Sequence, residues 1–386
     1  MGRRGNGEGS ITRHKKSGLY MARYWVETKD GRKRKTIYGK KRKDVADELA
    51  KVLSDRADGI FYSDENVTVG EHLDGWLKDC VRGSVRQSTF DRDSYLVRVH
   101  IKPSLGRIKL KKLTARDVQR FYRDRLDAEL SQSTVNKIHT VLHKALSQAV
   151  KWSLIPRNVT EAVKAPTPTP QEMRPLSAEE ASRLLDAARD DKFEALYVLA
   201  VTTGMRRGEL LGLRWSDVDR ENASVSVRRT LTRIGNGKRV VLGDLKTKKS
   251  RRTIRLTPQA VEALREHLTR QMEDIERLGD LYKDQGLVFT TATGSLIYPS
   301  NLRQRSLAPL LRNAGLPHIR FHDLRHTCAT LLLLKNVHPK FVQELLGHAT
   351  IAITLDTYSH VLPSMGDQTA RAMQDVLSPI EDSLTD

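Results

Sequence analysis

The sequence predicts an α+β fold that is mainly helical, and three observations lead to it. Most of the chain carries apolar residues three and four positions apart, the spacing of amphipathic helices. Alternation typical of strands is confined to the N-terminal region and to a segment near residues 224–256. Four prolines within residues 165–176 interrupt the helices. We therefore expect a small N-terminal three-stranded sheet with one helix, a helical bundle, and a mostly helical third domain with a small antiparallel sheet.

Composition narrows the possible functions. The 386 residues are enough for two or three domains, and their formal net charge of +20 favours a polyanionic partner. No apolar run reaches the length of a membrane span, which favours nucleic acid over a membrane. Cys80 and Cys328 show no CxxC spacing, which favours a reducing compartment and no structural zinc. A ribosomal or histone-like protein could share this charge, so basicity supports nucleic-acid binding but not catalysis.

Residues 1–60 predict a small basic domain. The first 50 residues hold 15 Lys and Arg against 6 Asp and Glu. Residues 18–26 alternate as a strand, Asp30-Gly31 signals a hairpin, residues 32–38 return, and a helix is expected at 41–54. A solvated basic tail is the alternative, but a tail would not need the aromatic residues and the turn.

Residues 66–164 read as a bundle of helices. Thr68 with Glu71 and Thr114 with Asp117 have the spacing of capping boxes, and a further helix opens near Ser131. Residues 165–176 form a linker, because alternating prolines favour extended chain.

Residues 177–376 form the third predicted domain, followed by an acidic tail at 377–386. Ser177 with Glu180 caps its first helix. Strands are expected in SVSVRRTLTRI, KRVVL and RRTIRL, around a turn at 235–237, and one more helical stretch near 366–377. The remaining helices are expected at 178–190, 192–203, 207–213, 258–277, 301–313, 322–335 and 339–346.

Five short motifs follow one another in the third domain: TGMRRGE, LKTKKSRR, HDLRH, LLGH and DTYSH. Their polar groups include two guanidiniums, an ammonium, two imidazoles and a phenol, a set able to cut and rejoin a phosphodiester without metal. One such motif arises by chance, but five in this order do not. The chain here resembles the tyrosine recombinases, and most closely the phage-type integrases.

The resemblance implies a role for each motif residue. Arg206 and Arg325 would clamp the scissile phosphate, since a planar guanidinium bonds two phosphate oxygens at once. Glu209, one turn beyond Arg206, would orient it. His322 would assist proton transfer or bond the phosphate, and His348 would donate a hydrogen bond to the phosphate.

Tyr358 would be the nucleophile, forming a 3′-phosphotyrosyl link that stores the bond energy, so that no ATP, metal or other cofactor is needed. Lys246 would protonate the leaving 5′ oxygen, with Lys248 and Lys249 as close competitors. HDLRH also places His322 and His326 at the i, i+4 spacing of zinc proteases. Asp replaces the usual Glu there and no third ligand is evident, so His326 is expected to be structural.

The resemblance also implies partners. Residues 1–60 resemble an arm-type DNA-binding domain, residues 66–164 a core-binding domain, and residues 177–376 the catalytic domain. We expect a site-specific integrase that inserts and excises a phage or mobile element. It would act as a tetramer on two DNA duplexes, through a four-way junction, in the nucleoid of a bacterial cytoplasm. A directionality factor and a host DNA-bending protein are possible partners. The candidate DNA-binding residues are Arg32, Lys33, Arg34, Lys35, Lys109, Lys111, Lys112, Lys248 and Lys249.

Three alternatives differ from this reading. A Xer-type or transposon recombinase shares the chemistry but usually lacks the basic N-terminal sheet. A type IB topoisomerase uses similar residues as a monomer. A DNA-binding regulator with this fold should have lost a catalytic residue, and none is missing here.

Overall fold

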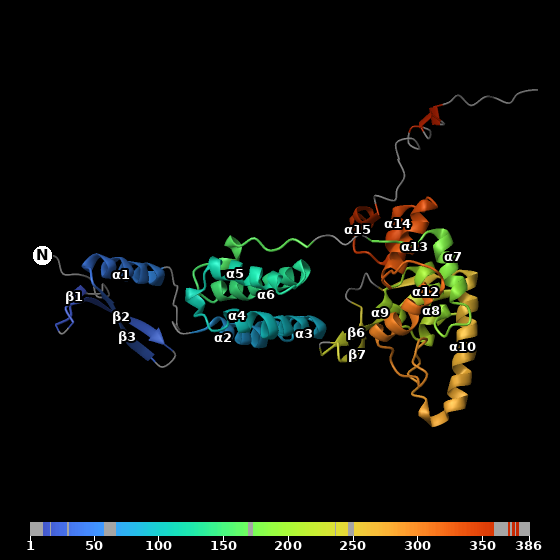
Figure 1. The fold of residues 1–386 in the computed structure, drawn as a ribbon, viewed down its shortest axis with the longest axis horizontal. Coiled ribbons are helices and arrows are strands. Elements are labelled where there is room, and N and C mark those ends of the chain that lie inside the picture. Colours follow the sequence, from blue (N-terminus) through green and yellow to red (C-terminus); the bar gives the residue numbers. More distant parts are fainter. Residues whose placement is uncertain are drawn as a thin grey trace, which may run out of the picture. The chain divides into compact units, whose positions relative to one another are not determined.

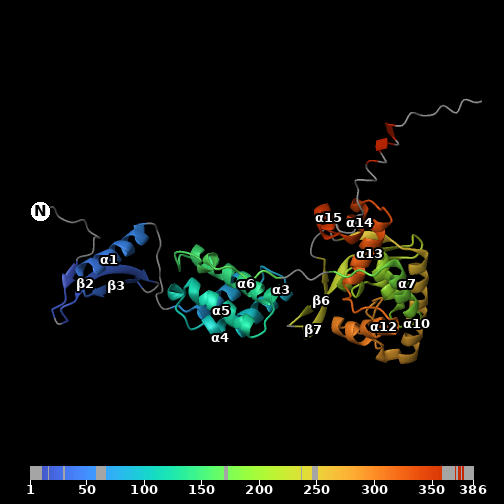
Figure 2. The ribbon, with the colours of Figure 1, turned by 45° about the horizontal axis from the view of Figure 1, so that its top comes forward.

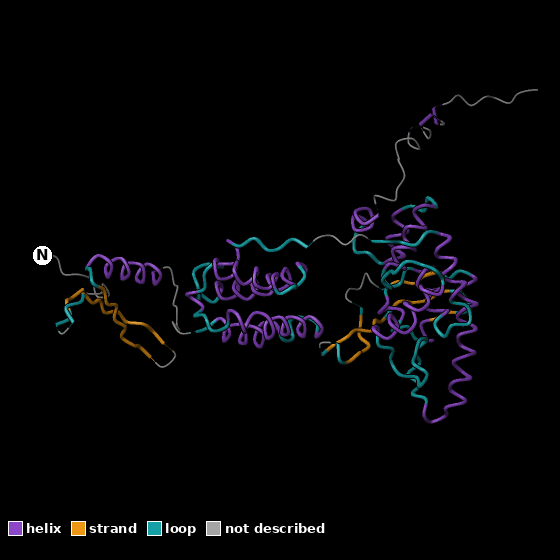
Figure 3. Tube along the Cα trace, in the orientation of Figure 1, coloured by secondary structure: helices purple, strands orange, loops and turns teal. Residues whose placement is uncertain are grey.

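The computed structural model describes residues 11–15, 17–28, 31–57, 67–168, 173–235, 237–245, 251–358, 370, 373–374 and 376–377, with the backbone alone for 26–28, 31–33 and 51–57. The chain divides into two compact units, Met1–Pro170 and Gln171–Asp386. The division falls inside the proline-rich segment. Helices predominate over strands (Figure 3).

The N-terminal part of the first unit is a three-stranded antiparallel sheet with one helix (Figure 1). Its elements are β1 (Ile11–Arg13), β2 (Tyr20–Thr28), β3 (Gly31–Gly39) and α1 (Arg42–Ala57). Ala22 and Ile37 face each other across β2 and β3 and pack with Val45 and Leu49 of α1. The opposite face of the sheet therefore carries the alternate residues.

The rest of the first unit is helical, with its own hydrophobic core. The helices are α2 (Val69–Trp76), α3 (Gln87–Leu96), α4 (Lys102–Leu105), α5 (Ala115–Asp127) and α6 (Gln132–Lys151). π-helical turns at Leu77–Val81 and Val97–Ile101 extend α2 and α3. Both predicted capping boxes form, with Glu71 and Asp117 each bonded to the backbone N–H of its N-cap threonine. Ser131 caps α6 by accepting from the N–H of Thr134.

The second unit is built around α8, which is buried on all sides (Figure 1). Ser177 caps α7 in the predicted capping box with Glu180. Figures 1 and 2 show α13, α14 and α15 grouped at one end of this unit. The helices are α7 (Ala178–Ala187), α8 (Glu194–Thr203), α9 (Arg207–Leu210), α10 (Pro258–Leu278), α11 (Pro299–Asn301), α12 (Ala308–Asn313), α13 (Asp323–Leu334), α14 (Pro339–Leu346) and α15 (Ile351–Tyr358).

Two small antiparallel sheets replace the single β segment expected from the sequence. One has the order β4–β5–β8, and the other is the hairpin β6–β7. The run SVSVRRTLTRI is broken at Arg228, so its two halves join different sheets. The strands are β4 (Val218–Asp219), β5 (Ser224–Val227), β6 (Arg229–Ile234), β7 (Arg239–Asp244) and β8 (Arg252–Arg255).

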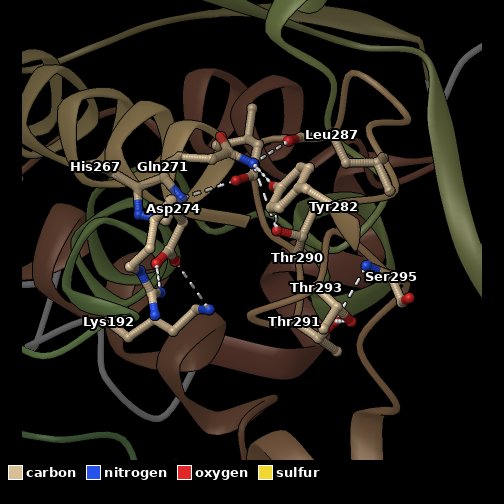
Figure 4. Close-up of polar contacts among 12 residues, drawn as sticks. Lys192, His267, Gln271, Asp274, Tyr282, Leu287, Thr290, Thr291, Thr293 and Ser295 are labelled. Atoms are coloured by element: carbon tan, nitrogen blue, oxygen red, sulfur yellow. Dashed lines mark hydrogen bonds and ion pairs between the residues drawn. The ribbon is translucent and has the colours of Figure 1, made fainter. Parts of the chain in front are cut away.

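A buried polar network fixes α10 against the segment that follows it. Gln271 donates from Nε2 to Tyr282 Oη at 2.8 Å and to the Leu287 carbonyl at 3.1 Å, and accepts from Trp215 Nε1 at 2.7 Å. Tyr282 in turn bonds Thr290. Figure 4 shows Tyr282, Leu287 and Thr290 around the Gln271 amide. The network satisfies buried polar atoms and so has a structural role.

The predicted fold class is confirmed: mainly helical, with small antiparallel sheets and a three-stranded N-terminal sheet. Three details of the third domain differ. The helix expected at 207–213 ends at Leu210. The helix expected at 301–313 starts earlier and contains a π-helical turn, Leu302–Leu307, between α11 and α12. No helix was expected at α15. In the described part of the chain, no helix is long and apolar enough to cross a membrane.

Candidate active site

Arg206 lies where α8 gives way to α9. Gly204 ends α8 in the left-handed conformation, with φ of 60°, and turns the chain so that Arg206 precedes α9. Arg206 donates from Nη1 to Glu209 Oε1 at 2.8 Å, and its backbone N–H donates to Glu209 Oε2 at 3.1 Å. Its Nη2 reaches the Gly347 carbonyl at 3.3 Å. Glu209 thus bonds both the guanidinium and the backbone N–H of Arg206.

Glu209 also holds a second guanidinium that the sequence reading did not single out. Arg252 of β8 donates from Nη2 to Glu209 Oε2 at 2.9 Å and from Nε to the Leu345 carbonyl at 2.6 Å. Both partners are buried, with side-chain exposures of 8% for Arg252 and 2% for Glu209. One carboxylate therefore ties β8 to α9 and orders two arginines.

Arg325 lies on α13 and is almost completely buried, with 2% of its surface exposed. Its Nη1 donates to the Gly204 carbonyl at 2.8 Å. Within the described residues, its buried Nη2 has no hydrogen-bond partner. Burial, reinforced by the nearby charge of Arg206, lowers the pKa of Arg325 to about 9. The residue remains cationic at neutral pH, with one donor to spare.

His348 follows the end of α14. Gly347 ends that helix with φ of 65°, as the LLGH motif predicted. The ring of His348 hydrogen-bonds through Nδ1 to Thr354 Oγ1 of α15 at 2.9 Å. Burial and the charges of Arg325 and Arg206 lower the pKa of His348 to about 4. The imidazole is therefore neutral at neutral pH, and its Nε2 is left for another partner.

His322 immediately precedes α13, with helical backbone angles. Burial, with His326, Arg325 and Arg206, lowers the pKa of His322 to about 4. Its ring meets that of His326 edge to face, with centroids 5.0 Å apart. The spacing of His322 and His326 resembles that of zinc proteases, but the described residues include no group of three His, Cys, Asp or Glu placed to hold a metal ion.

Tyr358 ends α15 and is 1% exposed, packed among Ala329, Leu333, Val342 and Leu346 of α13 and α14. Its hydroxyl lies 2.9 Å from Nδ1 of His326. Burial raises the pKa of Tyr358 to about 12, although Arg325 acts in the opposite direction. The phenol is therefore protonated at neutral pH, and it needs a proton acceptor before it can attack.

The structure thus brings Arg206, Glu209, His322, Arg325, His348 and Tyr358 into one domain, linked through shared neighbours. The predicted Lys246, Lys248 and Lys249 lie outside the described residues, as do the side chains of Arg32 and Lys33.

The remaining DNA-binding candidates lie in the first unit. Arg34 is exposed on the outer face of the N-terminal sheet, its Cζ 5.7 Å from the ring centroid of Trp25. Lys35, the next residue, lies on the opposite face, the one that packs on α1, and is the strand partner of Tyr24. Lys109, Lys111 and Lys112 are exposed around the 3₁₀ turn Leu110–Lys112. The last two border a cleft of about 860 Å³.

Three residues at the site were missed by sequence reasoning. Arg252 lies in the same LKTKKSRR motif as Lys246, so the motif was available as a signal. His326 lies in HDLRH and was expected to be structural, and its contact with Tyr358 was not predicted. Thr354, which bonds His348, lies four residues before Tyr358, but this contact could not be predicted because it depends on an unpredicted helix.

Comparison with known proteins places this site in context. Residues 174–365 match the phage integrase family, and residues 68–126 match the N-terminal SAM-like domain of phage integrases. The chain is 32% identical over 360 residues to a XerC-like tyrosine recombinase of Caldanaerobacter subterraneus, covering 89% of this chain and 92% of the relative. It is 30% identical over 333 residues to an integrase of Streptomyces ambofaciens, covering 83% of each.

Two solved structures share the fold. The Tn1549 transposon integrase in complex with circular intermediate DNA superposes with a TM-score of 0.64 at 22% identity, over 81% of this chain and all of the other. A lambda integrase dimer bound to a core site superposes with a TM-score of 0.56 at 20% identity, over 95% of this chain and 97% of the other.

Proposed function

The chain belongs to the phage integrase family of tyrosine recombinases, enzymes that cut and rejoin DNA strands, and from this membership we propose that it inserts a phage or other mobile element into a bacterial chromosome. Tyr358 attacks the scissile phosphate and forms a 3′-phosphotyrosyl link. The released 5′-hydroxyl of another strand then attacks that link. The observation that carries this proposal is the buried Nη2 of Arg325, which has no hydrogen-bond partner among the described residues and lies in a site that also holds Arg206.

Arg206 and Arg325 bind the non-bridging oxygens of the phosphate. Each is already held by protein atoms on one side, Arg206 by Glu209 and Arg325 by the Gly204 carbonyl. Guanidinium has five N–H donors in a rigid fork, so donors remain for phosphate oxygens. Preformed positions favour the transition state, because little reorganisation is needed when charge develops.

The two low-pKa histidines act as neutral hydrogen-bond donors. With Nδ1 of His348 engaged by Thr354, its Nε2 carries the proton toward the phosphate. His322 contributes a second neutral imidazole beside Arg325. Lys246 protonates the leaving 5′ oxygen in this scheme, a role carried over from the family motif K-T-x-x-S-R-R.

We assign separate DNA contacts to two parts of the first unit and the chemistry to the second unit. Residues 1–60 bind arm-type sites, residues 66–164 bind core-type sites, and residues 177–376 hold the chemistry, with 165–176 as linker and 377–386 as tail. The outer face of the N-terminal sheet supports the first assignment, because a cation and an exposed tryptophan lie together there. Exposed Lys109, Lys111 and Lys112 support the second.

The enzyme is expected to work as a tetramer on two duplexes in the bacterial cytoplasm, with a directionality factor and a host DNA-bending protein as further partners. Solved neighbours of this fold include a lambda integrase tetramer bound to a Holliday junction, which supports the assembly.

Covalent trapping tests the proposal. Wild type and Tyr358→Phe are incubated with nicked DNA carrying the element's attachment core, and protein–DNA adducts are resolved on a denaturing gel. An adduct with wild type alone supports both the reaction and the nucleophile. An adduct that persists in Tyr358→Phe would mean that another residue attacks, and tight binding with no adduct in either would favour a DNA-binding regulator.

A further inference from the structure

We propose that His326 accepts the hydroxyl proton of Tyr358 when the phosphodiester is cut and returns it when the strands are rejoined. This inference rests on the function proposed above and assigns a proton acceptor within it. The family motif, by contrast, directs attention to His322.

Geometry favours His326 over His322. Nδ1 of His326 lies 2.9 Å from Tyr358 Oη, within the range required of a general base. His322 instead meets the His326 ring edge to face. The two residues His326 and Tyr358 are 32 positions apart, and α13 and α15 bring them together.

The surroundings of His326 suit a group that gains and loses a proton. Burial and the cations Arg325 and Arg320 lower the pKa of His326, whereas Asp323 raises it. His326 is therefore neutral and able to accept at neutral pH. The other titratable groups that it meets are His322, Tyr358 and His348. Asp323, one helical turn before it, stabilises the imidazolium that forms.

The proposed step balances as follows. Tyr358 Oη forms a bond to phosphorus while the bond from phosphorus to the 5′ oxygen breaks. The Tyr358 proton moves to Nδ1 of His326. The other ring nitrogen, Nε2, keeps its hydrogen, so the imidazole becomes an imidazolium. The leaving 5′ oxygen takes a proton from the general acid, assigned above to Lys246. In rejoining, a 5′-hydroxyl attacks phosphorus and gives its proton to the group assigned to Lys246, the bond from phosphorus to Tyr358 Oη breaks, and His326 returns its proton to Tyr358.

A structural role for His326 makes a different prediction from a proton-accepting one. His326→Asn keeps an oxygen near the Nδ1 position, so it preserves a hydrogen bond to Tyr358 but cannot take up the proton. His326→Phe removes both. If the histidine only positions the phenol, Asn should substitute for it. If it accepts the proton, both variants should be slow.

The test measures single-turnover adduct formation on nicked attachment-site DNA by the full-length chain, from pH 6.5 to 9.5. Wild type, His326→Asn, His326→Phe and the control His318→Gln, an exposed histidine of the same domain, are compared. DNA binding is measured in parallel by gel shift. Each variant is then prepared with a fluorinated tyrosine of lower phenol pKa at position 358.

We expect His326→Asn and His326→Phe to bind DNA normally but to form adduct about 100-fold more slowly at pH 7, the scale of general-base catalysis. The deficit relative to wild type should shrink as pH rises, and the fluorinated tyrosine should restore much of the rate.

Wild-type rates in His326→Asn would overturn the inference, as would a deficit that neither pH nor the fluorinated tyrosine relieves. Wild type is run beside every variant, and its adduct formation tests the recombinase function itself. Failure of the proton-transfer role is thereby distinguished from failure of the proposed function.

Discussion

Arg252 and Glu209 form a buried ion pair between β8 and α9, with Arg252 Nη2 2.9 Å from Glu209 Oε2. The other carboxylate oxygen holds Arg206 at 2.8 Å. Arg252, which is outside the expected catalytic set, therefore shares the Glu209 carboxylate with Arg206, which is inside it. The orientation of Arg206 depends on both contacts.

Glu209→Gln should destabilise the protein. Burial acts to raise the pKa of Glu209, but Arg252 and Arg206 outweigh it and lower the pKa below the ordinary 4.5. A carboxyl with a lowered folded pKa contributes stability above the unfolded pKa and loses it as pH falls through the folded value. We expect a loss of about 3 kcal/mol at pH 7, as for a broken buried pair, and a smaller difference below pH 4.

Urea unfolding of the full chain measures this effect. The matched control is Glu262→Gln, whose exposed ion pair with Arg265 has side-chain exposures of 52% and 71% and should contribute nothing measurable. Equal midpoints for the two variants would show that the carboxylate between the arginines is not a structural anchor.

Gly204→Ala should be more damaging than the same change at Gly235. Both glycines have φ of 60°, so both variants carry similar backbone strain. A Cβ at Gly204 would lie 2.5 Å from Leu346 Cδ2, whereas a Cβ at Gly235 would have no described atom within 4 Å. We expect Gly204→Ala to lower stability by about 1–3 kcal/mol more than Gly235→Ala. Similar thermal midpoints for both would count against tight packing of α8 on α14.

Arg34→Ala and Lys35→Ala test the face used by the N-terminal sheet. Arg34 lies on the outer face beside Trp25, and Lys35 on the face toward α1. Arg34→Ala should weaken binding to arm-type DNA and reduce the slope of log affinity against log salt by about one. Lys35→Ala should have a smaller effect. Fluorescence anisotropy over a salt series measures both affinities. A larger effect from Lys35→Ala than from Arg34→Ala would contradict DNA binding on the outer face.

His348 should make the protein less stable in mild acid. Its pKa is about 4 when folded and 6.5 in the reference state. Between these values the unfolded chain binds a proton that the folded chain does not, so stability falls as pH falls from 6.5 to 4. His348→Gln should remove on the order of 2 kcal/mol of that decline. Thermal unfolding from pH 4 to 7 measures it, with His318→Gln as control. An unchanged slope in His348→Gln would contradict the buried neutral state.

Local signals in the sequence predicted local structure well. Capping boxes at Thr68, Thr114 and Ser177 depend on residues three apart, and all three form. Helix α15 was missed because its β-branched residues, such as Ile351 and Ile353, have no strong helical preference. It forms where Thr354 and Tyr358 are buried.

The motifs singled out candidate residues that the structure holds in one domain, but they did not predict what these residues contact. The bond between Arg325 and Gly204 joins positions 121 residues apart. The bond between His326 and Tyr358 depends on the placing of a helix that was not predicted. Such contacts follow from tertiary packing, which periodicity and spacing do not encode.

The glycines that end α8 and α14 have a further consequence for the charge of the site. Arg325 and Arg206 each bond a carbonyl at a helix C-terminus, where the backbone dipoles sum to a partial negative charge. Because these carbonyl groups carry no net charge, they hold the guanidiniums in place without neutralising their positive charge. Glu209 pairs with Arg206 and Arg252, whereas Arg325 is held by the Gly204 carbonyl. Arg325 therefore keeps its positive charge beside Arg206, where it can offset the charge that a phosphodiester gains as it passes from one negative charge to two.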